Sequence, residues 1–210
     1  KGEIIFPDRQ LLLFAEDVLK KNPGASIIFD VKSTRHLFSW IEDRGGIPII
    51  WKTGHSLIKA KMKESKAILA GEMSGHMFFN DRWYGFDDGV YAGARLIEIL
   101  SHFDNPSEIL EALPKSFSTP ELNIKLKEGE QHRIIKALQD EAKFQNAIEI
   151  IKIDGLRVEY DYGFGLMRAS NTTPVIVLRF EADSNKNLKL IQDEFKEILE
   201  AYIPQDKILF

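Results

Sequence analysis

The sequence has no cysteine, no long apolar run and no excess of basic residues. Without cysteine the chain forms no disulfide, no zinc–thiolate site and no thiolate nucleophile, which is compatible with a reducing compartment. Apolar runs such as residues 11–15 are far shorter than the ~20 residues that a membrane span requires. The start of the sequence shows no charged-then-apolar leader. We therefore expect a cytoplasmic protein with no membrane partner.

Acidic residues outnumber basic ones, 32 against 28, and the formal net charge is −4. Both halves share this balance, with 15 basic and 16 acidic residues in residues 1–115 and 13 and 16 in residues 116–210. Such a balance weighs against nucleic acid as the main partner. The run of four lysines in residues 59–66 is more simply interpreted as a solvated helix face than as a nucleic-acid patch.

The first half alternates short strand-like runs with segments of helical periodicity, a pattern that predicts an α/β domain with a mostly parallel sheet. Its apolar share is ordinary for a globular chain, since 44% of all residues are apolar. Strands are expected at residues 26–31, 47–51 and 67–70, and helices at residues 8–21, 34–44, 55–65 and 88–103.

Residues 104–120 contain three prolines and several serine and threonine residues, which predicts an interdomain linker that acts as a flexible hinge. The half that follows has the order strand, helix, several strands, helix, which predicts an α+β domain with helices on one face of an antiparallel sheet. Asp154-Gly155 is a hairpin signal. Strands are expected at residues 122–126, 148–153, 156–160 and 175–181, with residues 164–169 as an uncertain addition, and helices at residues 130–144 and 184–203.

A polar segment, Gly-Glu-Met-Ser-Gly-His, follows the third predicted strand, where ligands of α/β sheets usually bind. Glu72 accepts two hydroxyl hydrogens, whereas Ser74 and His76 both donate or accept. The residues alone favour a sugar site and a simple polar turn about equally.

A second polar segment, Arg-Ala-Ser-Asn-Thr-Thr-Pro, lies between two strand-like runs. The planar fork of Arg168 matches a phosphate, and Ser170, Asn171 and Thr172 add short neutral donors. From these residues alone, an ordinary hairpin loop is the more frequent interpretation.

Three further segments offer weaker signals. Lys32 ends a strand, and Thr53, Gly54 and His55 join a strand to a helix, where first-turn amides favour anions. Surface or capping roles are the more frequent explanation for such residues. The acidic pair at residues 87–88 is better explained by capping of the following helix than by a cation site.

Taken together, these segments resemble the α-D-phosphohexomutases. The run GEMSGHMFFNDRWYGFDDGVYAGARLIEIL is similar to the sugar-recognition segment of that family, and DVKSTRHL, WKTGHSLIKAKMKE and MRASNTTP occur in the family's order at compatible spacings. The resemblance covers essentially the whole chain and is closest to bacterial members that act on both mannose and glucose phosphates. Members that isomerise glucosamine phosphate tend to have glutamine in place of Met73 and glycine in place of Asn171.

The resemblance implies a half-protein. Family members have four domains, of which the first carries the phosphoserine loop and the second the magnesium loop, and neither loop is found in this sequence. Residues 1–115 would be domain three, and residues 116–210 would be domain four, which has a TATA-box-binding-protein-like α+β fold in the family. The phosphoryl donor is therefore expected outside this chain, and the chain alone is expected to be inactive. The missing domains one and two would be its partners within a monomer.

The resemblance also implies the chemistry. The family is an isomerase class of intramolecular phosphotransferase that interconverts hexose 1-phosphate and hexose 6-phosphate through a 1,6-bisphosphate, such as glucose 1,6-bisphosphate. Glu72 and Ser74 would hold two sugar hydroxyls, with His76 as support. Lys32 and His55 would line the cleft and are candidates to assist proton movement, and Thr53 and Gly54 would add contacts. The non-transferring phosphate would be bound by Arg168, Ser170, Asn171 and Thr172.

Two other functions stay open from the sequence: a stand-alone phosphosugar-binding or regulatory module, which needs the same loops, and a nucleic-acid-binding protein, which the charge balance disfavours.

Overall fold

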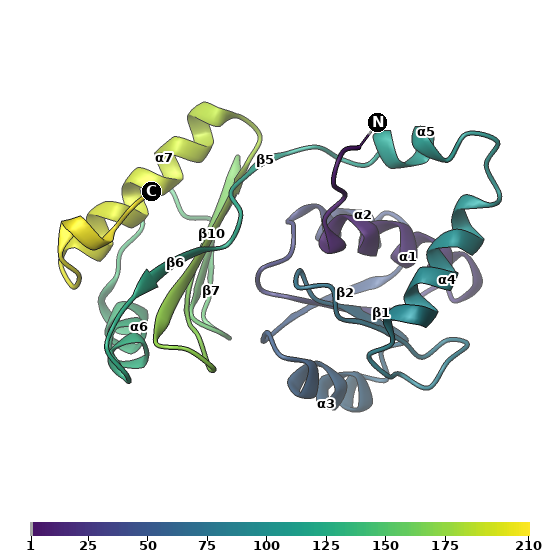
Figure 1. Ribbon diagram of the computed structural model, residues 1–210, viewed down its shortest axis with the longest axis horizontal. Coiled ribbons are helices and arrows are strands. Elements are labelled where there is room, and N and C mark those ends of the chain that lie inside the picture. Colours follow the sequence, from purple (N-terminus) through teal and green to yellow (C-terminus); the bar gives the residue numbers. More distant parts are fainter. Residues whose placement is uncertain (1) are drawn as a thin grey trace. The chain divides into compact units, whose positions relative to one another are not determined.

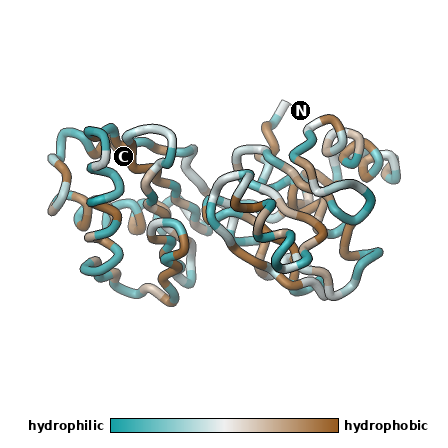
Figure 2. Tube along the Cα trace, turned by 90° about the horizontal axis from the view of Figure 1, so that it is seen from below, coloured by the Kyte–Doolittle hydropathy of each residue, from teal (hydrophilic) through white to brown (hydrophobic). Residues whose placement is uncertain are grey.

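The computed structural model describes residues 2–210 and divides the chain into two compact units, Lys1–Pro114 and Lys115–Phe210. Each unit is described by itself below. In Figure 2, apolar stretches alternate with hydrophilic ones along the chain of each unit, as expected where every element has a buried and a solvated side.

The first unit contains a four-stranded sheet in the order β2-β1-β3-β4 (Figure 1). Strand β1 pairs in parallel with both β2 and β3, whereas β4 pairs antiparallel with β3. The predicted mostly parallel sheet is therefore confirmed. Its elements are α1 (Pro7–Lys21), β1 (Ser26–Asp30), α2 (His36–Glu42), β2 (Ile47–Trp51), α3 (His55–Ser65), β3 (Leu69–Gly71), β4 (Met77–Phe79), α4 (Gly89–Leu100) and α5 (Pro106–Glu111).

Helices cover both faces of this sheet because its central strand is apolar on both sides. In β1, Ile27 and Phe29 join a core that includes residues of α1, α2 and α4, and Ile28 joins the opposite core with Ile58 and Met62 of α3. Figure 1 shows α3 on the other side of the sheet from α1 and α2. A central parallel strand buried on both faces is typical of α/β proteins.

Residues 104–120 differ from the flexible linker that their composition predicts. Helix α5 forms there with Asn105 as its N-cap, and Leu113 just beyond it is buried in the core of the first unit. Farther on, β5 (Phe117–Ser118) pairs with a strand of the second unit's sheet. The boundary between the two units nevertheless falls inside this stretch, between Pro114 and Lys115, so the segment without a helix or strand is shorter than predicted and the hinge motion stays a prediction.

The second unit contains an antiparallel sheet with the order β5-β10-β9-β8-β7, in which β6 also pairs with β10. Buried residues of α6 and α7 pack on one face of this sheet, against Leu156, Met167 and Leu178 among others. The predicted α+β class is confirmed, and residues 164–169 belong to a full strand. The remaining elements are β6 (Leu122–Lys125), α6 (Glu130–Glu141), β7 (Glu149–Ile151), β8 (Leu156–Tyr160), β9 (Gly163–Ala169), β10 (Val175–Ala182), α7 (Asn185–Glu200) and the 3-10 turn η1 (Gln205–Lys207).

Candidate functional site

The carboxyl ends of β1, β2 and β3 bring polar side chains together in the first unit. Asp30, the last residue of β1, is completely buried and connects all three strand ends. Its carboxylate accepts hydrogen bonds from the Ser33 hydroxyl at 2.6 Å, the Thr53 hydroxyl at 3.1 Å and the backbone N–H of Met73 at 3.1 Å. The ammonium of Lys32 lies 4.0 Å from the same carboxylate. Asp30 therefore fixes the loops that carry the predicted site residues, although the sequence did not single it out.

Glu72 follows β3 and is only 2% exposed. Its Oε2 accepts hydrogen bonds from the backbone N–H of Gly54 at 3.2 Å and from the Ser74 hydroxyl at 3.4 Å. Its Oε1 is buried and has no hydrogen-bond partner among residues 2–210. Because a buried acceptor without a partner costs roughly 1–3 kcal/mol, this oxygen is one that a ligand donor would stabilise.

Burial raises the pKa of Glu72 above its ordinary value of 4.5, and the negative charge of Asp30 raises it further. His76, the Gly54 hydrogen bond and Lys32 oppose that shift but do not cancel it. The site thus contains a carboxylate whose charged form is disfavoured. Perturbed pKa values of this kind cluster at functional sites.

Gly54 makes the backbone approach to Glu72 feasible. Its φ of +132° is one that residues other than glycine rarely adopt. It also directly precedes α3, so its N–H is not needed inside the helix and is available to the carboxylate.

The two predicted site histidines are neighbours, with ring centroids 5.9 Å apart. His76 forms a 2.6 Å bond through Nδ1 to the carboxylate of Asp87. When Nδ1–H donates to this carboxylate, the neutral ring has Nε2 as its acceptor, so Asp87 selects the tautomer. Asp88 alone caps α4, by accepting from the N–H of Tyr91, so the capping interpretation is confirmed for Asp88 and wrong for Asp87.

The second predicted segment is the tight loop between β9 and β10. The Ser170 hydroxyl accepts from the backbone N–H groups of Thr172 and Thr173 at 3.4 and 3.3 Å. These bonds are long, and Asn171, Thr172 and Thr173 are exposed. The loop therefore presents several donors that are only weakly occupied, an arrangement suited to an anion.

Arg168 enters the same loop from the end of β9. Its Nε donates to Asp154 at 3.0 Å, an ion pair that leaves its terminal nitrogens with no partner among the described residues. Asp154 lies in the β7–β8 hairpin, where Gly155 has a φ of +83° and a Cβ would lie 2.2 Å from the Met167 carbonyl oxygen. Glycine thus lets this hairpin approach β9 closely enough to orient the guanidinium.

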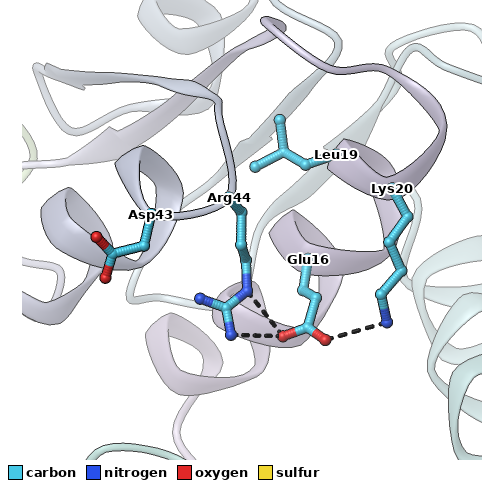
Figure 3. Close-up of a pocket in the computed structure, with 5 residues that line it drawn as sticks. All are labelled: Glu16, Leu19, Lys20, Asp43 and Arg44. Carbon is cyan, nitrogen blue, oxygen red and sulfur yellow. Dashed lines mark hydrogen bonds and ion pairs between the residues drawn. The ribbon is translucent and has the colours of Figure 1, made fainter.

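A surface hollow of about 390 Å³ in the first unit is lined by Glu16, Leu19, Lys20, Asp43 and Arg44 (Figure 3). It contains no predicted site residue. Burial alone would raise the pKa of Glu16, but hydrogen bonds from Lys20 and Arg44 outweigh it and lower the pKa. The charges in this hollow therefore satisfy one another, and it is not a candidate site.

Neither a metal-binding cluster nor a membrane-spanning helix is found within residues 2–210. No group of three or more His, Asp or Glu side chains is arranged to hold a metal ion. No helix of this part of the chain has the length and apolarity to cross a bilayer. Lys59 and Lys63 of α3 and Lys66 directly after it are exposed, whereas Lys61 pairs with Glu64.

The fold and these two loops define a class: an α/β unit with polar groups at its strand ends, followed by an α+β unit with a basic hairpin loop. Residues 6–117 match the model of phosphoglucomutase/phosphomannomutase, alpha/beta/alpha domain III, and residues 121–198 match the C-terminal domain of the same family. The chain belongs to the phosphoglucomutase/phosphomannomutase family.

Relatives with high identity exist in several bacteria. The chain is 63% identical over 201 residues to a phosphoglucomutase of Neisseria gonorrhoeae and 57% identical to the phosphomannomutase/phosphoglucomutase of Pseudomonas aeruginosa, in both cases over 95% of its length. A Burkholderia thailandensis structure of this family is 59% identical, with a TM-score of 0.91 over 97% of this chain and 43% of that one. A Thermus thermophilus structure at 18% identity and TM-score 0.65 shows the same fold.

The chain spans less than half the length of these relatives, 44% of the Neisseria protein and 43% of the Pseudomonas protein. Since the matched models are domain III and the C-terminal domain, the unmatched part of each relative precedes the region that this chain represents.

Proposed function

We propose that this chain is the substrate-binding half of a phosphohexomutase that interconverts hexose 1-phosphates and hexose 6-phosphates. The observation that carries the proposal is the Glu72 oxygen without a hydrogen-bond partner in a strand-end site. The same chain also has a loop of neutral donors next to the guanidinium of Arg168, which Asp154 orients. One site suits sugar hydroxyls and the other suits a phosphate.

In the first unit, Glu72 and Ser74 form hydrogen bonds with two vicinal sugar hydroxyls. The Glu72 carboxylate accepts these bonds, and the Ser74 hydroxyl donates or accepts. The ligand's donor replaces the missing partner of Oε1, whereas Gly54 keeps Oε2 in place. A grip on hydroxyls that mannose and glucose share tolerates both sugars, because these sugars differ at another carbon. It also works in both orientations that a bisphosphate must adopt when it turns around.

In the second unit, Arg168 gives a bidentate contact to the phosphate that is not transferred. Ser170, Asn171 and Thr172 add neutral hydrogen bonds from the loop. Charge-assisted pairs of arginine and phosphate are among the stronger hydrogen-bonded contacts, and their planar geometry selects phosphate over a point-like anion.

Lys32 and His55 line the sugar site near Asp30 and Glu72, with Thr53 and Gly54 as further contacts. Either Lys32 or His55 assists proton movement at the reacting hydroxyl. His76, fixed by Asp87, supports the same loop. Positioning and neutralisation of charge supply most of the catalysis in phosphoryl transfer, so these residues act mainly by orienting the sugar.

The phosphoryl donor and the magnesium ion belong to the part of the longer protein that this chain does not include. Residues 2–210 offer no cluster of ligands that fits the ion. We therefore assign no step of the transfer to this chain, and glucose 1,6-bisphosphate is expected as the intermediate of the complete cytoplasmic enzyme. The distant mutase of Aspergillus fumigatus has been crystallised with glucose 1,6-bisphosphate and, separately, with magnesium and GlcNAc-6P.

The second candidate function is a stand-alone phosphosugar-binding or regulatory module. It needs the same two binding loops as the mutase. The sequence that precedes Lys1 in the gene separates the two: a phosphoserine loop and a metal loop there support the mutase, and their absence supports the module.

The function is tested with the longer protein. It should convert glucose 1-phosphate and mannose 1-phosphate to the 6-phosphates, and Glu72→Ala should abolish most of that turnover. A matched control is Glu64→Ala, which removes an exposed carboxylate from α3. The proposal is wrong if neither sugar phosphate is turned over, or if the two alanine variants behave alike.

A further inference from the structure

Helix α4 is apolar on two opposite sides. Its inner side contributes Ala92 and Ile99 to the core of the first unit. Its outer side is formed by residues at helical spacing of three and four: Val90, Gly93, Ala94 and Ile97, all exposed. Val90 is 87% exposed and Ile97 is 69% exposed, so no part of the first unit covers them.

The outer side also lacks charge, because the two charged residues of α4, Arg95 and Glu98, form ion pairs with residues outside this helix. Arg95 is 3% exposed and pairs with Asp17 and Asp81, whereas Glu98 pairs with Arg82. A surface helix normally places charged residues on its solvent side. Helix α7 does so, with exposed Lys186, Lys189, Asp193 and Glu197.

Small residues form the centre of this outer side. Nothing lies within 4 Å of a Cβ built on Gly93, and Ala94 adds only a methyl group. Val90 and Ile97 flank them one turn on either side, so the centre of this side is formed by residues with small side chains that another backbone can approach closely. The loop before α4 adds two exposed aromatic rings, Tyr84 and Phe86, stacked 5.5 Å apart.

An apolar helix side is expected to be buried, either in protein or in a membrane, and this holds for the outer side of α4 as well as for its inner side. Helix α4 has 12 residues, and no helix among residues 2–210 meets the requirements of a membrane span. The remaining explanation is a protein surface. The relatives are more than twice as long as this chain, so a protein of their length would have a large, covalently connected segment to provide such a surface.

We propose that the outer side of α4 (Val90, Gly93, Ala94 and Ile97) is the docking surface for the preceding domains of the longer protein. The inference rests on the part of the proposed function that assigns such domains to this chain. It does not depend on sugar binding or on turnover, because none of these four residues belongs to the proposed site. The docking would hold the domain with the sugar site against the domains that supply the phosphoryl donor.

Cysteine accessibility tests the proposal directly, because the chain has no native cysteine. Ala94→Cys is prepared in the 210-residue chain and in the longer protein, and maleimide labelling of its peptide is followed by mass spectrometry. We expect rapid labelling in the 210-residue chain and labelling slower by about tenfold or more in the longer protein. Lys136→Cys, at a side chain 71% exposed on α6, is the control and should label equally in both.

Equal labelling of Ala94→Cys in both proteins would overturn the proposal. So would slow labelling in the 210-residue chain that depends on its concentration, because the occupant would then be a second copy of the chain.

A second pair of variants tests the docking without a cysteine, in case the new side chain itself changes the labelling. Ile97→Asp should lower the Tm of the longer protein much more than that of the 210-residue chain, whereas Leu190→Asp, at an exposed leucine of α7, should affect both alike. Equal shifts for Ile97→Asp would contradict the docking.

Discussion

Residues 71–76 of the first unit and residues 168–174 of the second are both polar segments at the end of a strand, but they are built differently. The first encloses the buried Glu72, with Asp30 tying three strand ends together beneath it. The second is a hairpin loop of hydroxyl and amide groups whose tip, residues 171–173, is exposed, and it is supported by the ion pair of Asp154 with the buried Arg168. A buried, hydrogen-bonded site suits the fixed pattern of sugar hydroxyls, and an exposed loop tip suits a phosphate that must be reached and released.

The largest predicted effect is the absence of mutase turnover in the 210-residue chain. Both segments are proposed to bind, and neither supplies a phosphoryl group, so the 210-residue chain should show no mutase turnover. The measurement is formation of glucose 6-phosphate from glucose 1-phosphate with glucose 1,6-bisphosphate present. Turnover that persists after the longer enzyme has been rigorously removed would mean that one of the two segments carries a nucleophile.

The next effect separates the phosphate loop from the sugar site. In the longer protein, Arg168→Ala should weaken binding of glucose 1-phosphate by roughly tenfold to a hundredfold, because a hydrogen bond to a charged group contributes ~1.5–3 kcal/mol. Arg168→Lys should recover only part of this loss, since an ammonium cannot reproduce the planar fork. Calorimetric titration with glucose 1-phosphate and with free glucose should place the loss on the phosphorylated ligand alone. A change within about twofold for Arg168→Ala would remove this loop from the phosphate site.

A third prediction tests how the second unit orients Arg168. Gly155→Ala and Gly129→Ala both put a methyl group on a residue with a φ of +83°, but only at Gly155 does the new Cβ meet backbone atoms. Gly129→Ala should cost about 1–2 kcal/mol, the usual penalty of a left-handed residue. Gly155→Ala should cost more, by a further ~1–3 kcal/mol of overpacking. Urea unfolding of the 210-residue chain measures both, and similar costs would show that the β7–β8 hairpin does not need its close approach to β9.

The smallest effect is a pH-dependent stability change at Glu72. Because its folded-state pKa is raised above 4.5, the folded state holds this proton more tightly than the unfolded chain does. The contribution of Glu72 to the free energy of unfolding therefore falls as the pH rises from 4.5 through the raised value. Glu72→Gln should thus be more stable than the parent at pH 7, and the difference should shrink below pH 4.5.

The control for that change is Glu64→Gln, which alters an exposed carboxylate of α3. It should show no comparable gain at neutral pH. If Glu72→Gln were no more stable than Glu64→Gln at pH 7, the charged form of Glu72 would not be disfavoured, and the contrast between the two segments would disappear.

Local signals predicted the elements well where they were strong. Helix α3 has the predicted bounds of residues 55–65, and β2 those of residues 47–51. Strand β4 was missed because three residues are too few to display an alternation. Helix α2 starts at His36 rather than at residue 34, although the Thr34 hydroxyl does accept from the His36 N–H at 3.4 Å.

The sequence predicted the loops of the candidate site but not the residues that support them. The loops with Glu72 and Arg168 stand out by composition. The groups that support them do not: Asp30 resembles any strand-terminal residue, Asp87 resembles a helix cap, and Asp154 resembles a turn residue. Each acquires its role from a partner distant in sequence, such as Met73 for Asp30, so only the fold reveals it.

The most direct test of the account is an NMR titration of the ¹⁵N-labelled 210-residue chain with glucose 1-phosphate, free glucose and inorganic phosphate in turn. If both segments bind as proposed, glucose 1-phosphate moves the backbone amide signals of Gly54, Met73 and Gly75 together with those of residues 170–173. Inorganic phosphate should move only residues 170–173, and glucose only the first group. The account would be contradicted if phosphate moved the signals around Glu72, or if glucose 1-phosphate acted on the lysines of α3 and left both segments unchanged.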